Sequence, residues 1–216
     1  MHFTRRSFVG AGLAGLAGAA VGAERTGGDR PGQERPGQDR PGAGSSSAVA
    51  PTLLRRALDA LQRHRGNIDH PDLIGIADFS QHSRAPRFHL INLGDGTTTS
   101  HLVAHGRGSD PAHTGWLERF SNQPRSEATS AGAYRTEAIY VGEHGRSMRL
   151  AGLDPTNDNA ASRAIVVHGA WYVSEDIIQH FGLLGRSEGC LAVANSSLDE
   201  VLTRLGPGRL IYADKA

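Results

Sequence analysis

The sequence predicts a mainly β domain of the α+β class, in which a few helices flank the strands. Short apolar runs bounded by glycine or polar turn residues recur between residues 73 and 213, which is typical of strands. Only three segments carry apolar residues at helical spacing. The composition, with 38% apolar and 21% charged residues in a chain of 216, suits one globular domain and a remainder outside it.

This remainder lies at the front of the sequence, where residues 1–23 are typical of an export signal. Arg5 and Arg6 precede the uncharged stretch 7–22, and cleavage is expected after Ala23. The stretch is rich in glycine and alanine and shorter than the roughly 20 apolar residues of a spanning helix, so we expect no permanent membrane anchor. The paired arginines resemble a twin-arginine export signal, and an ordinary secretory signal is the alternative.

Residues 24–50 are predicted to be a disordered tether. An acidic–Arg–Pro–Gly unit recurs every five residues, at 29–32, 34–37 and 39–42, and no large apolar residue interrupts these repeats. Such a segment has no apolar surface to bury and therefore cannot offset the entropy of ordering. We expect the folded domain to run from residue 51 to residue 216.

Three helices are expected within this domain. The first covers residues 53–61, where leucine and alanine recur at helical spacing. Ser174 is the predicted N-cap of a second helix at 175–181, because its hydroxyl can accept a hydrogen bond from a free backbone amide. A third helix at 198–205 is ended by Gly206.

The strands are predicted from apolar runs between turn signals. The second expected strand turns into the third through the glycine-containing sequence 94–96, which favours a hairpin. The expected strands are 73–79, 88–93, 97–104, 138–143, 148–150, 164–168 and 209–213.

The charge balance argues against a nucleic-acid partner. Lysine and arginine number 23 against 22 aspartates and glutamates, and the basic residues are scattered, so no concentrated positive face is expected. The histidines do not follow the His-Glu-x-x-His pattern of a zinc hydrolase, so no metal site is expected.

Cys190 is the strongest candidate for chemistry. It is the only cysteine in the chain, which excludes an intramolecular disulfide. An unpaired thiol in an oxidising compartment is a liability unless it is buried or used. The preceding loop, 185–189, is polar and bounded by glycines, so it can present a thiolate beside backbone N–H groups. A buried, inert cysteine is the alternative.

A base is needed beside the thiol, and His168 is the first candidate. It ends an apolar run and is followed by Gly169, which lets another chain segment approach closely. His105, which Gly106 follows, is a rival base or a substrate contact. The other histidines, His144 among them, are assigned to surface or core positions.

These residues resemble the L,D-transpeptidases with the YkuD-type catalytic domain, whose signature is His-Gly, a spacer and Ser-x-Gly-Cys. Here residues 170–186, 17 in number, separate His168-Gly169 from Ser187-Glu188-Gly189-Cys190. The resemblance is closest to the murein L,D-transpeptidase branch, in which the loop reads Gly-Arg-Ser-x-Gly-Cys. It covers most of residues 51–216, including the pieces 105–109, 120–122, 157–160 and 168–174.

The resemblance implies a mixed β-sandwich and a cysteine acyltransferase without a cofactor, exported to the periplasm or cell wall. Its partners would be peptidoglycan stem peptides. Cys190 would attack the bond after the L-centre of the diamino acid in a tetrapeptide stem and expel D-alanine, with His168 as base and then acid. Pairing with His168 is expected to lower the pKa of the thiol. A carbapenem would acylate the same cysteine.

The same resemblance suggests roles for the neighbouring residues. Backbone N–H groups of Gly189 and Cys190 could hold the oxyanion. Ser187 could position His168 or the substrate, and its alternative role is to cap the loop. The common Ser-His-Gly-Cys-x-Arg form is altered at the second and sixth positions, so Arg186 is the candidate for binding the substrate carboxylate.

The remaining substrate contacts are expected near the two candidate bases. Trp171 and Tyr172 could wall a groove for the acceptor, although core packing is an equal alternative for one of them. Gly169 and His105 complete the expected set. Two other functions remain open, an L,D-carboxypeptidase that hydrolyses the same bond and a non-catalytic cell-wall-binding module.

Overall fold

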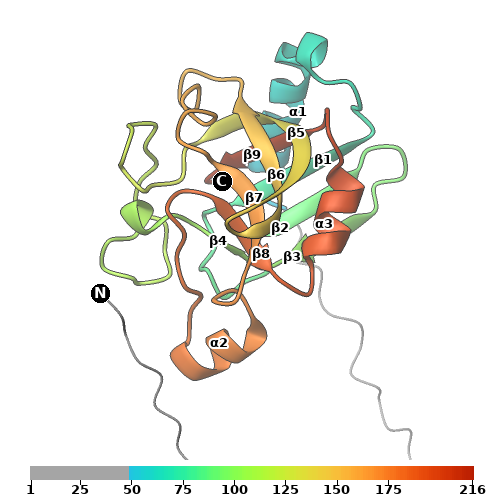
Figure 1. The fold of residues 1–216 in the computed structure, drawn as a ribbon. Coiled ribbons are helices and arrows are strands. Elements are labelled where there is room, and N and C mark those ends of the chain that lie inside the picture. The colour runs from blue at the N-terminus through green and yellow to red at the C-terminus, as the bar shows by residue number, and fades with distance from the viewer. Residues whose placement is uncertain (1–48) are drawn as a thin grey trace, which may run out of the picture. The chain divides into compact units, whose positions relative to one another are not determined.

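The structure is a computed structural model that describes residues 49–216 (Figure 1). The export signal expected at 1–23 lies outside the described residues, and so does the tether expected at 24–50, except for its last two residues. Val49 and Ala50 pack beside the first helix, so they belong to the fold.

Within residues 49–216, nine strands form one mixed sheet, accompanied by three α-helices, and the predicted mainly β, α+β class is confirmed. The strands are β1 Leu73–Asp78, β2 Phe88–Asn92, β3 Thr98–His101, β4 Val103–Ala104, β5 Gly132–Gly142, β6 Gly145–Gly152, β7 Val166–Ala170, β8 Leu191–Ala194 and β9 Leu210–Asp214. The helices are α1 Pro51–Arg63, α2 Glu175–Phe181 and α3 Leu198–Leu205, with short 3-10 turns at Arg65–Asn67 and Arg107–Ser109.

The strands follow the order β3-β2-β1-β9-β5-β6-β7-β8-β4. Two pairs are parallel, β1 with β9 and β7 with β8, and the others are antiparallel. Only Leu102 separates the two edge strands β3 and β4 in the chain. The expected strand 97–104 is therefore two strands, and the chain passes from one edge of the sheet to the other.

Both halves of the sheet bury side chains in a common core, as expected for a mixed β-sandwich. Phe88 and Leu90 of β2 belong to the same buried cluster as Met148 of β6 and Leu191 of β8. Helix α3 adds its buried face to this core. Burying such apolar side chains contributes about 1.5–3 kcal/mol each, which makes this cluster the main source of stability.

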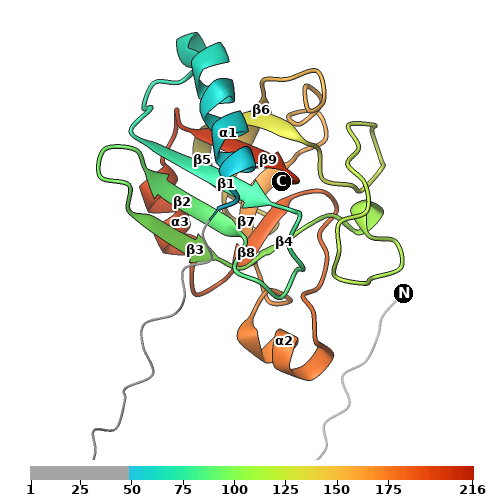
Figure 2. The same ribbon diagram turned by 180° about the vertical axis from the view of Figure 1, so that it is seen from behind.

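Helix α1 covers the outer face of β1 and β9 (Figure 2). Ile74 and Ile76 point toward α1 because alternate residues of a strand face opposite sides, and Ala77 faces the inner core. Leu53 and Ala57 of α1 are fully buried against them. In the described part of the chain, no helix is long and apolar enough to cross a membrane.

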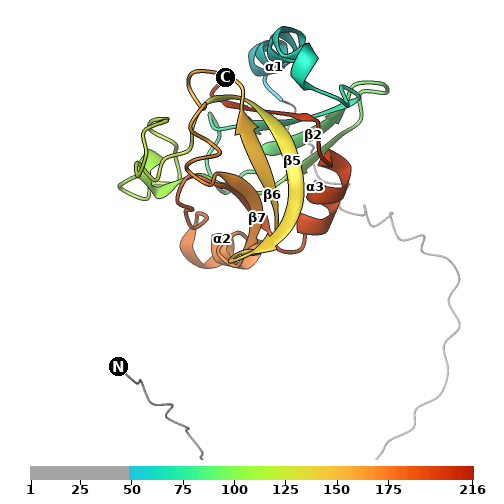
Figure 3. The same ribbon diagram turned by 45° about the horizontal axis from the view of Figure 1, so that its top comes forward.

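Strand β5 begins at Gly132, well before the predicted start at residue 138, and it is strongly bent (Figure 3). Its pairing with β6 shifts between Thr136 and Ile139, which marks a β-bulge. A bulge increases the bend and twist of a strand. The β5–β6 hairpin therefore curves along the sheet and carries its turn, residues 142–145, toward the end of β7.

Candidate active site

The pairing of β7 with β8 brings His168 and Cys190 to the same face of the sheet. In this parallel pair His168 is in register with Ala192, and Cys190 lies two residues before it. Side chains two residues apart on a strand face the same side. Val167 and Leu191 face the inner core, so His168 and Cys190 face outward.

The outward face opens into a cleft of about 580 Å³. It holds seven of the residues singled out from the sequence, namely Cys190, His168, Ser187, Gly169, Trp171, Tyr172 and Arg186. Arg107, Glu143, His144, Ala170, Glu188 and Asn195 complete the lining. The candidate nucleophile, the candidate base and the candidate carboxylate-binding arginine therefore share one hollow.

The thiol of Cys190 is neutral in this arrangement. Its side chain is only 8% exposed, and Sγ donates to the carbonyl oxygen of Ala164 at 3.6 Å. Burial raises the pKa of this thiol, and Glu188 adds to the rise, while the backbone amide of Val166 and the charge of Arg163 oppose it. The net direction is upward, because the charged thiolate loses hydration in the buried position.

The ring of His168 is fixed in one tautomer. Its Nδ1 lies 2.9 Å from the carbonyl oxygen of Gly169, and a carbonyl only accepts, so Nδ1 carries the proton. Nε2 is then the unprotonated nitrogen, as a general base requires. Burial lowers the pKa of His168, His144 lowers it further, and the bond to Gly169 opposes both.

The expectation that pairing lowers the pKa of Cys190 is wrong for this structure. Among residues 49–216 no hydrogen bond joins Sγ to the His168 ring, and burial favours the neutral form of both groups. The resting site is therefore a thiol beside a neutral imidazole.

Ser187 closes the loop that precedes Cys190. Its Oγ donates to the carbonyl oxygen of Cys190 at 2.7 Å and accepts from the amide of Gly189 at 3.2 Å. This is the loop-capping role that the sequence left open for Ser187. The Gly189 amide, expected as an oxyanion donor, therefore has a partner within the loop.

The backbone at position 189 requires a glycine. Its φ is +114°, which side chains rarely tolerate, and a Cβ would lie 2.8 Å from the carbonyl oxygen of Ala128. The glycine before Cys190 thus lets the loop pass against the segment 126–128 while it points the cysteine at the cleft.

A second segment holds the loop from outside. Ser187 forms an isolated bridge with Gly106, donates its amide to the carbonyl of His105 at 2.9 Å, and accepts from the amide of Arg107 at 2.8 Å. A Cβ on Gly106 would lie 2.7 Å from the backbone of Gly189. The sequence piece that begins at His105 therefore acts through its backbone, as a scaffold for the cysteine loop.

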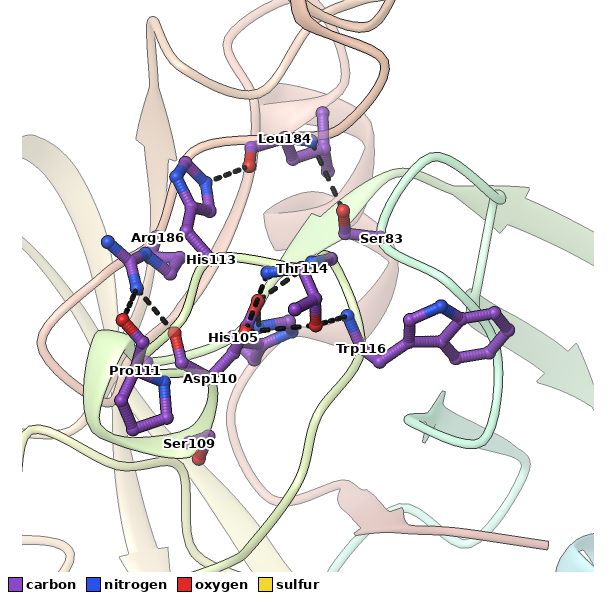
Figure 4. Close-up of polar contacts among 12 residues, drawn as sticks. Ser83, His105, Ser109, Asp110, Pro111, His113, Thr114, Trp116, Leu184 and Arg186 are labelled. Atoms are coloured by element: carbon purple, nitrogen blue, oxygen red, sulfur yellow. Dashed lines mark hydrogen bonds and ion pairs between the residues drawn. The ribbon is translucent and has the colours of Figure 1, made fainter.

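The His105 side chain does not line the cleft. It is 1% exposed and lies between Arg87, whose Nη2 is 2.7 Å from Nδ1, and Asp110, whose Oδ2 is 3.3 Å from Nε2 (Figure 4 shows the Asp110 side). Burial and the nearby positive charge of Arg87 lower the pKa of His105 to about 3. The structure thus places His105 in a buried network, not against a substrate.

Asp110 is the centre of this network. Its carboxylate accepts from the amides of Thr114 and Gly115, both at 2.8 Å, and from the Thr114 hydroxyl (Figure 4). Burial alone would raise the pKa of Asp110, but these hydrogen bonds lower it below the ordinary value. Burial lowers the pKa of Arg87 to about 9. Both buried groups are charged at neutral pH.

Arg186 links this network to the cleft. Its Nη1 donates to the backbone carbonyls of Asp110 and Pro111, the latter at 3.2 Å (Figure 4). The guanidinium is therefore held by the segment that Asp110 organises, while the residue also lines the cleft.

The two predicted aromatic residues lie differently. Trp171 is 74% exposed and meets Tyr172 edge to face, with ring centroids 5.8 Å apart. Tyr172 is half-buried, and burial raises its pKa to about 12. Tyr172 is therefore partly packed against the core, whereas Trp171 presents its indole at the edge of the cleft.

Sequence reasoning missed several cleft residues, and one of them, His144, is in ring contact with the candidate base. Its ring stacks on His168, with centroids 4.4 Å apart and planes at 23°. His144 lies between the predicted strands 138–143 and 148–150, but only the pairing of β6 with β7 brings this turn to His168. Glu143 and Asn195 gave no signal in sequence either, and Arg107 appeared only as part of the piece 105–109. Among residues 49–216 no group of three His, Cys, Asp or Glu side chains could hold a metal ion.

We expect the free energy of unfolding to fall as the pH drops below about 6.5. Unfolded His105 takes up a proton near its ordinary pKa of 6.5, whereas folded His105 resists it down to about 3. The unfolded state thus binds more protons in this window, and stability is lost with falling pH. At pH 5 the loss from His105 is about 2 kcal/mol. Burial also lowers the pKa of His89 and His101, which adds in the same direction.

Urea unfolding at pH 7 and pH 5 measures this loss. The variant His105→Gln should be less stable at both values but should lose less between them. Equal pH dependence of the variant and the parent protein would show that His105 does not resist protonation.

A family model described as L,D-transpeptidase catalytic domain matches residues 45–213. No curated protein sequence matches the chain. Among solved structures, an L,D-transpeptidase from Mycobacterium smegmatis is similar at 13% identity and a TM-score of 0.40, over 66% of this chain and 58% of that one.

Two further solved structures are similar as well, the second of them from Mycobacterium tuberculosis. The L,D-transpeptidase LdtMt1 in complex with imipenem shares 15% identity, with a TM-score of 0.40, over 66% of this chain and 59% of that one. An L,D-transpeptidase from strain H37Rv shares 18% identity, with a TM-score of 0.39, over 67% of this chain and 58% of that one. The present chain thus spans less than two thirds of the length of these structures.

Proposed function

This chain belongs to the L,D-transpeptidase catalytic domain family, and on that basis we propose that it is a cysteine-dependent L,D-transpeptidase acting on peptidoglycan tetrapeptide stems. One observation carries the proposal. Cys190 and His168 face the same cleft from adjacent strands, and the bond from Nδ1 to Gly169 leaves Nε2 free to accept a proton. We also propose export to the periplasm or cell wall, where such stems occur, in accord with the signal expected at 1–23.

In the first half-reaction Sγ of Cys190 attacks the carbonyl carbon that follows the L-centre of the diamino acid. His168 Nε2 takes the thiol proton as the carbon–sulfur bond forms, which suits a resting neutral pair. The tetrahedral intermediate then expels D-alanine, whose amine receives that proton from His168. The product is a thioester on Cys190.

In the second half-reaction an amine of another stem attacks the thioester. His168 removes a proton from this amine, the new amide bond forms, and the Cys190 thiol leaves with the proton. Water in place of the amine would give an L,D-carboxypeptidase. Because orienting a bound nucleophile is worth roughly 7–11 kcal/mol, an acceptor groove would favour the amine over water. Trp171, exposed at the edge of the cleft, is our candidate wall of that groove.

Arg186 is our candidate for binding a substrate carboxylate. It lines the cleft, and the carbonyls of Asp110 and Pro111 hold its guanidinium in place. A guanidinium fixed in this way loses little further entropy when it pairs with a carboxylate. Arg107 also lines the cleft, but it is already paired with Glu127 and Glu188.

Incubation of the purified protein with tetrapeptide stems tests the proposal. We expect a thioester at Cys190 in the intact mass, cross-linked dimeric product and ping-pong kinetics. Tripeptide alone, unaffected by added acceptor amine, would leave the carboxypeptidase. Stem binding without a thioester would leave the non-catalytic binding module. A carbapenem, the class of the imipenem bound in the LdtMt1 structure, should add once and at Cys190.

A further inference from the structure

A second histidine lies flat against the candidate base. His144 and His168 stack with ring centroids 4.4 Å apart and planes inclined by 23°. His144 is exposed on its other side, in the turn of the β5–β6 hairpin. His168, by contrast, is only 4% exposed. The stack thus covers one face of the His168 ring and forms part of the cleft wall.

The hairpin is built to hold this turn in place. Ser147 of β6 is in register with His168 of β7, and His144 precedes Ser147 by three residues in the chain. Just before the turn, Tyr140 lies so close to Gly142 that a Cβ there would meet its ring at 2.6 Å. The guanidinium of Arg149 lies over the Tyr140 ring, 4.1 Å from the ring centroid. Backbone pairing and side-chain packing therefore both fix the approach of His144.

The stack supplies a constraint that the hydrogen bond to Gly169 lacks. That bond fixes the position of Nδ1, but a ring held at one atom can still tilt about it. A flat neighbour against the ring face removes this tilt. Nε2 then stays directed into the cleft that also holds Cys190.

The charges around His168 come from three segments. The hairpin turn contributes Glu143 and His144, the cysteine loop contributes Arg186, Glu188 and Cys190, and the 3-10 turn contributes Arg107. Of these, His144 is the one in ring contact, and its effect is to disfavour a positive charge on His168. A proton on His168 would face a second imidazole across the stack, with like-charge repulsion if that ring is protonated too.

We propose that His144 is a positioning residue of this site, which holds the His168 ring by stacking so that Nε2 stays directed toward the cleft. This assignment rests on the proposed function, because it concerns the base of the same cysteine chemistry. His144 acts through His168 and need not touch the substrate.

Two variants separate the parts of the role. His144→Phe keeps a flat ring against His168 but cannot carry a charge, and His144→Ala removes the ring altogether. His180→Ala is the matched control, because His180 is an exposed histidine that packs edge to face on Phe181 in α2, away from the cleft lining. The thermal midpoints of all three should match that of the parent protein.

The first readout is the rate of Cys190 alkylation by iodoacetamide against pH, and the second is the titration of His168 followed by NMR. We expect His144→Phe to keep the plateau rate within about twofold. We expect His144→Ala to lose about tenfold, as misplaced catalytic groups do. In both variants His168 should titrate at a higher pH, so the acid limb of the rate profile should shift to higher pH. The control should change neither readout.

Variants of His144 that behave like His180→Ala in rate and titration would overturn the proposal. Equal losses in His144→Phe and His144→Ala would overturn it as well, because stacking would then not be the source of the effect. Neither readout requires turnover. If the tetrapeptide stem fails to acylate the parent protein, the proposed function fails, while the His144 assignment is still decided by titration and alkylation.

Discussion

Replacing Cys190 with alanine is expected to abolish acyl-enzyme formation while the domain stays folded. The variant lacks the only thiol of the chain, and loss of a nucleophile that acts with its base lowers turnover by about 10⁴-fold or more. The structural cost should be small. The thiol makes one long hydrogen bond, to Ala164, and its removal leaves a cavity of a single atom.

Intact mass after incubation with a tetrapeptide stem measures the acyl-enzyme, and circular dichroism checks the fold. Cys190→Ser is the matched variant, since its hydroxyl can keep the hydrogen bond to Ala164 but is a far weaker nucleophile than the thiol. Both variants should be folded and unacylated. Stem turnover by folded Cys190→Ala would rule out the mechanism.

Replacing Asp110 with alanine is expected to have the largest effect on stability. The carboxylate is fully buried, satisfies two backbone amides and neighbours the buried charge of Arg87. Removing one partner from a buried charge network costs about 3–5 kcal/mol, because the remaining charge and amides are left uncompensated. Urea unfolding at pH 7 measures the change.

Asp95→Ala is the matched control. Asp95 also accepts hydrogen bonds from a backbone amide and a threonine hydroxyl, both of Thr97, but it lies exposed in the turn between β2 and β3. Its replacement should leave the unfolding midpoint nearly unchanged. Equal effects of the two replacements would show that burial of the Asp110 charge does not stabilise this part of the fold.

The local signals in the sequence predicted the helices well. The expected helix at 175–181 coincides with α2, and Ser174 caps it by accepting from the amide of Ile177 at 3.2 Å. The helix expected at 198–205 coincides with α3, and Gly206 follows it with a positive φ. Caps and turn glycines act over a few residues, so one sequence suffices to read them.

Long-range pairing decided what the sequence could not predict. Tyr134 and Arg135 lie in β5 because β9 pairs with this stretch, although the consecutive polar residues 135–137 hide the strand in the sequence. Likewise, the motif around Cys190 and His168 was visible as a pattern, and the cleft joins both residues. His105 followed an apparently similar pattern, but Arg87 and Asp110, which bury it, come from other segments. His144 reaches His168 only through the register of β6 on β7.

The position of β9 has a consequence for synthesis. This strand lies between β1 and β5, although it is the last strand of the domain to leave the ribosome. Until Leu210–Asp214 has emerged, β1 and β5 lack their shared partner, and the two halves of the sheet stay unjoined. Pairing between strands so distant in sequence is slow. The nascent domain therefore cannot complete its core before β9 has emerged, and until then the unpaired edges of β1 and β5 are open to aggregation.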